Sequence, residues 1–225
     1  VRFSWGKNGN DNISDFGYAA QLLDRYYNHA EIRAIGSMKI DNKQYGRSSY
    51  YFSMMNRNLC AWATWRRAWR DFDYYLDNVS IKELRKSLRK YSAGSKEILY
   101  WSERLQEIHS DRLNESSWDI QFLISIWLNN GVGICPNVNL STNIGFDPEG
   151  THTTNHNSSA ANLETHSILP LSHPTIIKVN RESDLNYDKL YFQPVEYGWS
   201  GIKRFPFRMN KRVKLFLGKE GSWFK

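Results

Sequence analysis

Cysteine is scarce in this 225-residue chain, which has only Cys60 and Cys135. Both have apolar and aromatic neighbours, so we expect two small buried side chains, not a disulfide, and a reducing compartment. Long apolar runs are also lacking, since no stretch approaches the roughly 20 residues of a membrane-spanning helix. Residues 1–11 have no apolar segment of the secretory-signal type. These absences predict a cytoplasmic protein.

Several motifs of familiar chemistry are missing too. The sequence has no glycine-rich phosphate loop of either common spacing, no serine nucleophile elbow and no signature of a DNA-recognition helix. A closed zinc site is not expected, because no cysteine or third histidine lies at a usual ligand spacing. Aromatic, basic and acidic residues are therefore the remaining candidates for function.

Aromatic residues and positive charge are abundant: 9 Trp, 13 Tyr, 11 Phe and a formal net charge of +7. This composition is globular, and one compact domain with a large core is the simplest interpretation. A basic surface suits a nucleic acid, a sugar nucleotide or an acidic lipid. We expect no nucleic-acid partner, because the basic residues are dispersed and the aromatic ones lie in apolar helices.

Apolar spacing and cap residues predict an alternation of helices and strands. The first predicted helix is 15–28, with Ser14 as its cap, and a second segment enters a helix near Ala63. A charged pair of surface helices is predicted at 81–91 and 95–109, and a buried helix at 118–130. The predicted strands are 32–37, 132–134 and 138–144, and the predicted loops are 41–49 and 147–159. Helix 15–28 is expected to bury a face made of Phe16, Ala19, Ala20, Leu23, Tyr26 and Tyr27.

Asp119 is the first candidate for chemistry, because it opens the buried helix. One explanation is structural: Ser116 and Asp119 have the spacing of a capping box, and an acid complements the helix dipole. The other is functional, since a carboxylate at a helix start can deprotonate an acceptor hydroxyl.

Rings and guanidinium groups alternate just after Cys60. Trp62, Trp65, Arg66 and Arg67 are candidate substrate-binding residues, because rings stack on sugars and bases and arginines hold diphosphates. The alternative is that the tryptophans, Trp69 included, pack into the core and the arginines are solvated.

The polar loop at 147–159 contains two histidines, His152 and His156. A histidine could complete an oxygen-rich Mn²⁺ or Mg²⁺ site. The alternative is an exposed loop histidine without a ligand.

Three motifs taken together resemble a known family. They are CAWATWRRAW at Cys60–Trp69, SWDIQFLISIWLNNGVGICPNVNLSTNIGF at Ser117–Phe146, and GTHT at Gly150–Thr153. Their order and spacing resemble bacterial family 2-like glycosyltransferases, the nucleotide-diphospho-sugar transferases, over roughly Phe16–Pro174.

The resemblance implies a partial GT-A fold, a Rossmann-like α/β architecture with an inserted helical pair at about 79–110. Residues 1–174 would be the C-terminal portion of that domain, and 175–225 a basic aromatic extension. The donor would be a nucleotide sugar, the acceptor a glycan or lipid-linked sugar in bacterial surface polysaccharide assembly, and the cofactor Mn²⁺ or Mg²⁺.

The resemblance also implies roles for single residues. Asp119 matches the family's proposed catalytic base, His152 matches the group that completes the metal site, and Trp118 and Gln121 lie beside the base on the substrate-binding side. The family's first α/β units and acidic cluster are not recognisable before residue 15, where Asp11 is the only nearby acid. We therefore expect that residues 1–225 cannot perform sugar transfer by themselves. The alternative is a truncated or inactive relative that acts as a glycan- or lipid-binding module.

The tail after Ile202 has eight basic residues against the single acid Glu220, interleaved with aromatic and leucine residues. Such a segment could dock on the anionic inner face of the cell membrane. A solvated tail with some rings packed on the domain is the alternative.

Overall fold

The computed structural model describes residues 13–54, 61–91, 94–110, 118–142 and 163–192. In chain order, the elements are α1 (Ile13–Arg25), β1 (Ile32–Gly36), β2 (Tyr50–Ser53), β3 (Trp62–Ala63), α2 (Arg66–Trp69), α3 (Ile81–Lys90), α4 (Ser95–Ser110), α5 (Asp119–Leu128), β4 (Val132–Pro136) and α6 (Arg181–Phe192). The predicted α/β class is confirmed, while the GT-A arrangement remains a prediction.

The four strands form one mixed sheet in the order β2–β4–β1–β3. The central pair, β1 and β4, is parallel, with Ile35 opposite Ile134, and the outer strands β2 and β3 are antiparallel to their neighbours. The chain after β1 and the chain after β4 therefore leave the same edge of the sheet.

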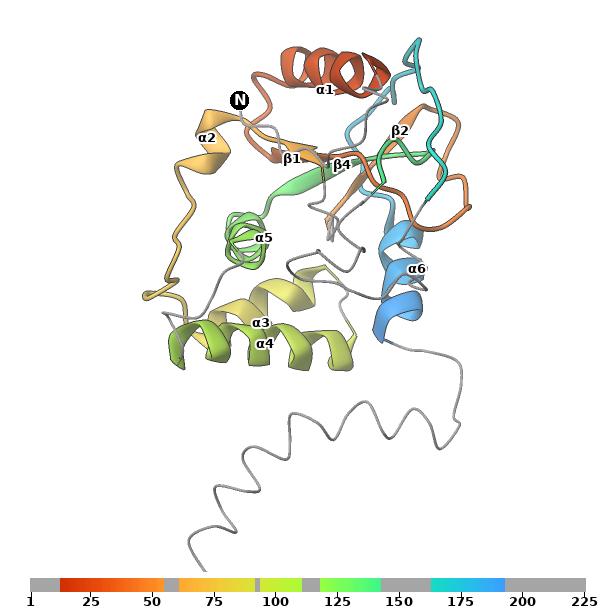
Figure 1. Cartoon of the computed structure of the whole chain (residues 1–225). Coiled ribbons are helices and arrows are strands. Elements are labelled where there is room, and N and C mark those ends of the chain that lie inside the picture. The colour runs from red at the N-terminus through yellow and green to blue at the C-terminus, as the bar shows by residue number, and fades with distance from the viewer. Residues whose placement is uncertain (1–12, 55–60, 92–93, 111–117, 143–162, 193–225) are drawn as a thin grey trace, which may run out of the picture.

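Helices cover both faces of this sheet, α1 on one side and α5 on the other, with α3 and α4 beyond α5 (Figure 1). The buried apolar residues accordingly form two clusters. Trp62 of β3 packs in the cluster of α3, α4 and α5, whereas Ala63 packs in the cluster of α1, because successive side chains of a strand point to opposite faces.

The predicted helical pair is present as α3 and α4, and Ser80 and Glu83 form a capping box at the start of α3. Its placement differs from the prediction of a surface appendage. Leu88 of α3 and Trp101 of α4 are buried in the same cluster as α5. Ser87 and Tyr91 also donate hydrogen bonds of 2.6 Å to the carbonyl of Trp127. The pair is thus a packed layer of the domain.

Helix α1 begins at Ile13, so Ser14 lies in its first turn and is not its cap. The predicted buried face is only partly right. Tyr18 and Leu22 are buried, whereas Phe16 and Tyr27 are exposed. Tyr26, a member of the predicted face, is buried, and its hydroxyl lies 2.7 Å from that of Tyr50.

The junction between α5 and β4 lies at Asn130–Gly131, where the predicted helix 118–130 ends. Asn130 adopts the left-handed conformation, with φ of 52°. Gly131 is needed for space, because an added Cβ would lie 2.4 Å from Arg33 Cδ and 2.9 Å from the Ile126 carbonyl oxygen. The sharp turn therefore places β4 directly beside β1.

Three predictions of local structure were wrong or incomplete. The helix expected near Ala63 is instead the short strand β3 followed by α2, and residues 138–142 form no strand. The elements β2 and α6 were not predicted. Residues 179–192 also join the domain, since Val179 pairs with Phe52 and Ser53 donates a hydrogen bond of 2.5 Å to Asp184. Residues 179–192 thus contact β2, and the expected domain boundary at residue 174 stays a prediction.

Within the described residues, no helix combines the length and the apolar character needed to cross a membrane. Cys135 is a free thiol in β4, and Cys60 lies outside the described residues.

Candidate functional site

The first turn of α5 holds the predicted base. Trp118 is the residue that precedes the helix, and its side chain makes no capping hydrogen bond. Asp119 is therefore the first helical residue, which rules out the predicted capping box with Asp119 at the third position. Ser116 itself lies outside the described residues.

The carboxylate of Asp119 is half-buried, and its Oδ1 atom is shielded from solvent without a hydrogen-bond partner among the described residues. A buried polar atom without a partner is costly to the folded state. The positive end of the helix dipole, at the start of α5, favours the negative charge. Such an oxygen is free to accept a proton or a hydrogen bond from a ligand.

Gln121 lies two residues further on and is fully buried. Within the described part of the chain, neither its amide nitrogen nor its amide oxygen has a hydrogen-bond partner, and the same holds for the buried indole nitrogen of Trp62. These groups include donors and acceptors, which is the combination that binds hydroxyl groups.

An aromatic stack packs against the first turn of α5 through Trp118 and Phe122. The Trp62 ring centroid lies 5.2 Å from that of Trp118 and 4.9 Å from that of Phe122, the neighbours in sequence of Asp119 and Gln121. Trp69 stacks on Trp62 at 6.0 Å with an interplanar angle of 28°. Because Trp118 and Trp69 are only half-buried, the stack presents ring surface near the start of α5.

Two other predicted binding residues have structural contacts instead. Trp65 is buried on the α1 side of the sheet, and its indole donates a hydrogen bond of 2.9 Å to the Leu23 carbonyl. Arg67 Nη2 donates to the carbonyls of Tyr26, His29 and Ile32 at 2.7–3.1 Å. Arg67 also stacks on Trp65, 4.3 Å from the ring centroid.

These contacts favour a structural role for Trp65 and Arg67, which tie α2 to α1 and β1. The structure therefore brings Trp62 and Trp118 into contact on the side of the sheet covered by α5, the helix of Asp119 and Gln121, and places Trp65 on the other side, where Arg67 stacks on it. Arg66 is exposed on α2.

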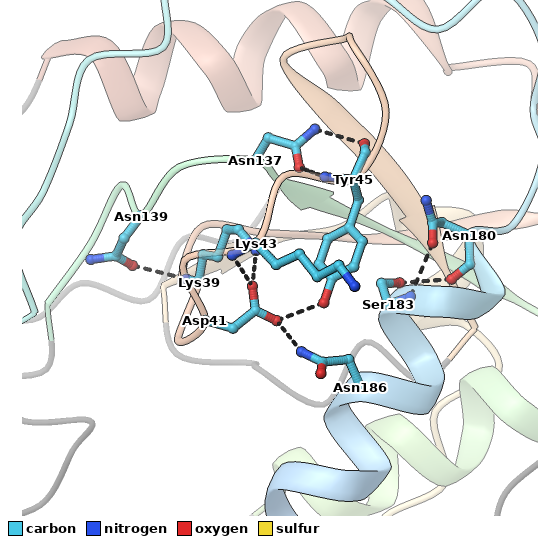
Figure 2. Close-up of polar contacts among 9 residues, drawn as sticks. All are labelled: Lys39, Asp41, Lys43, Tyr45, Asn137, Asn139, Asn180, Ser183 and Asn186. Carbon is cyan, nitrogen blue, oxygen red and sulfur yellow. Dashed lines mark hydrogen bonds and ion pairs between the residues drawn. The ribbon is translucent and has the colours of Figure 1, made fainter.

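A second polar cluster, which the sequence did not reveal, follows the carboxyl ends of β1 and β4. Figure 2 shows its side chains converging from the loop after β1, the loop after β4 and α6. Asn137 accepts a hydrogen bond of 2.8 Å from the Tyr45 backbone N–H and donates to the carbonyls of Tyr45 and Ser48. Asn139 accepts a hydrogen bond of 2.9 Å from the backbone N–H of Lys39.

Asp41 is the centre of this cluster. It pairs with the buried ammonium of Lys39 and accepts hydrogen bonds from the Tyr45 hydroxyl at 2.9 Å and from Asn186 of α6 at 3.1 Å. Lys39 Nζ also lies 4.6 Å from the Tyr45 ring centroid.

Burial alone would raise the pKa of Asp41, but the hydrogen bonds from Lys39, Tyr45 and Lys43 outweigh it and leave the pKa below its usual range. Burial and Asp41 together raise the pKa of Tyr45. We therefore assign the cluster a structural role, which is to fix the loop after β1 against α6.

The described residues contain no group of three or more histidine, cysteine, aspartate or glutamate side chains arranged to hold a metal ion. His152 and His156 fall in 143–162, outside those residues, as does the tail from 193 onward. The expected Mn²⁺ or Mg²⁺ site at His152 therefore stays a prediction.

Comparison of the chain with protein-family models, with curated proteins and with solved structures gives no match. The residues at the start of α5 and the motifs of the sequence are accordingly the features that indicate a function.

Proposed function

We propose that the chain forms the acceptor side of a glycosyltransferase that uses a nucleotide-diphospho-sugar donor and a glycan or lipid-linked acceptor in bacterial surface polysaccharide assembly. One observation carries the proposal: the buried Oδ1 of Asp119 has no partner among the described residues, in the first turn of a helix beside half-buried tryptophan rings. The parallel pair β1 and β4, with α5 leading directly into β4, supports the partial GT-A arrangement.

In this proposal Asp119 is the general base. Its carboxylate takes the proton of an acceptor hydroxyl while that oxygen bonds to the anomeric carbon of the donor. The bond from the anomeric carbon to the diphosphate breaks, and the nucleoside diphosphate leaves with the electron pair. A single displacement of this kind inverts the configuration at the anomeric carbon. The rings of Trp118 and Trp69 would stack on the apolar face of a sugar.

The proposed divalent ion would counter the charge of the leaving diphosphate when bound, and His152 is the residue of this chain that we propose to hold it. None of the steps assigned to Asp119 uses that ion.

The test is Asp119→Asn in the protein as encoded, with any residues that precede Val1. Turnover of a panel of nucleotide sugars with Mn²⁺ or Mg²⁺ should fall by about 10²–10⁴-fold, the usual contribution of a general base. Asp24→Asn is the matched control, since Asp24 is an exposed carboxylate of α1. Equal turnover of Asp119→Asn and wild type would refute the role of Asp119. Saccharide binding without turnover in the wild type would instead identify a binding module.

A further inference from the structure

Exposed aliphatic side chains gather in the last described part of the chain. Ile176 is 64% exposed, Leu185 47% and Leu190 53%. Leu185 and Leu190 lie on α6, and Ile176 lies in the segment that leads into this helix. A surface on which such residues adjoin one another is typical of an interaction site.

The charges beside these residues are positive. Arg181, Leu185 and Lys189 follow one another at four-residue intervals, so they form one row along the exposed side of α6. Lys178 is exposed as well.

Of the three acids of α6, only Glu182 is exposed on this side, with a side chain 65% exposed, and Lys43 offsets its charge. Asp184 and Asp188 are buried, and Glu182 pairs with Lys43. The outer surface of residues 176–190 therefore combines aliphatic side chains with cations that have no acidic partner among the described ion pairs.

The inner side of α6 is firmly attached to the domain. Asn180 accepts a hydrogen bond of 3.0 Å from the Ser183 backbone N–H, as the cap residue of a helix does. Asp184 accepts a hydrogen bond of 2.5 Å from the Ser53 hydroxyl. Asn186 donates to Asp41 in the cluster of Figure 2. Because polar contacts hold α6 in place, its leucines are not needed to dock the helix and remain available to a partner.

We propose that the outer face of residues 176–190, made of Ile176, Lys178, Arg181, Leu185, Lys189 and Leu190, docks on an anionic lipid surface. Aliphatic side chains enter the region between the headgroups and the acyl chains, while lysine and arginine meet the lipid phosphates. The eight basic residues after Ile202 extend the same chemistry along the sequence. The inference does not depend on glycosyl transfer, so either can fail alone.

The test measures partition of the full chain onto vesicles of equimolar phosphatidylcholine and phosphatidylglycerol, with pure phosphatidylcholine vesicles for comparison. The double variant Leu185→Asp/Leu190→Asp should lose about tenfold or more of the partition constant, because the apolar contact is removed and two negative charges are placed beside the lipid phosphates. Leu99→Asp is the matched control, since Leu99 is an exposed leucine of α4, 42% exposed. It should bind as the wild type does.

A second variant, Arg181→Glu/Lys189→Glu, changes only exposed side chains and keeps the test valid if the leucine variant unfolds. Each cation near an anionic surface contributes about fivefold to the partition constant, so this variant should lose more than tenfold and the loss should shrink in high salt.

If both variants had the same partition constant as the wild type, the proposal would be overturned, and the tail would remain as the membrane contact. Equal binding of the wild type to both kinds of vesicle would also overturn it. So would loss of a wild-type dimer in the leucine variant with unchanged vesicle binding, which would identify a second copy of the chain as the partner.

Discussion

The start of α5 and the cluster around Asp41 both gather buried polar groups, but they differ in how these groups are satisfied. Asp41 has four hydrogen-bond donors: Lys39, Lys43, Tyr45 and Asn186. Asp119 Oδ1 has no partner within the described residues, and the same is true of both amide atoms of Gln121. A network in which every polar group has a partner stabilises the fold. Buried polar groups without partners lower the free energy of unfolding, and a bound ligand that pairs with them can offset this loss.

The largest stability effect is expected in the complete network. Asp41→Ala would leave the ammonium of Lys39, whose side chain is 4% exposed, without its anion. Loss of one partner of a buried pair should lower the free energy of unfolding by about 3 kcal/mol. Asp119→Ala breaks no hydrogen bond among the described residues and should change that free energy by less than about 1 kcal/mol. Urea unfolding of both variants measures the two free energies of unfolding. Equal losses in the two variants would contradict the proposed difference between the two regions.

The same network should make stability sensitive to acid. The pKa of Asp41 in the folded chain lies below its ordinary value of 3.8. A depressed pKa stabilises the fold at pH values above the unfolded pKa, and this stabilisation disappears as the pH falls through the folded pKa.

The thermal unfolding midpoint of the wild type should therefore fall more steeply below about pH 4 than that of Asp41→Asn, which cannot titrate there. Parallel pH profiles of the two proteins would contradict this assignment.

The smallest stability effect is expected at Gln121. Gln121→Leu replaces a buried amide without partners by an apolar side chain, so the free energy of unfolding should stay constant or rise by about 1 kcal/mol. Asn137→Leu is the comparison variant, because it removes three hydrogen bonds and should cost about 2–3 kcal/mol. Calorimetry measures the free energy of unfolding of both variants. A large loss of this free energy in Gln121→Leu would mean that the Gln121 side chain supports the fold.

The sequence predicted elements whose apolar residues recur with a helix or strand period. Helix α3 follows the predicted range closely because Ser80 and Glu83 mark its start and Leu84 and Leu88 lie on one face. Helix α6 escaped prediction because it buries Ser183, Asp184 and Asp188, which are polar, so no apolar period marks its inner side. Strand β2 has four residues, and its register is set by distant β4.

The candidate site was predictable in part for the same reason. Asp119 was visible from the sequence because it opens an apolar helix. The sequence did not show whether Trp62 or Trp65 faces α5. The answer depends on β3, a strand of only two residues, in which the side chain of Trp62 points toward α5. Asp41 and Asn137 were hidden because their partners lie far away along the chain and their loops carry no motif.

The most direct test of the central claim uses the indole N–H signals of the tryptophans in a ¹⁵N NMR titration with saccharides and nucleotide sugars. The indole of Trp62 has no partner among the described residues, whereas those of Trp65 and Trp127 donate to the carbonyls of Leu23 and Met54. If the start of α5 binds a sugar, the Trp62 signal should shift saturably while the Trp65 and Trp127 signals stay in place. An unmoved Trp62 signal across the panel, or equal shifts of all three, would contradict the account.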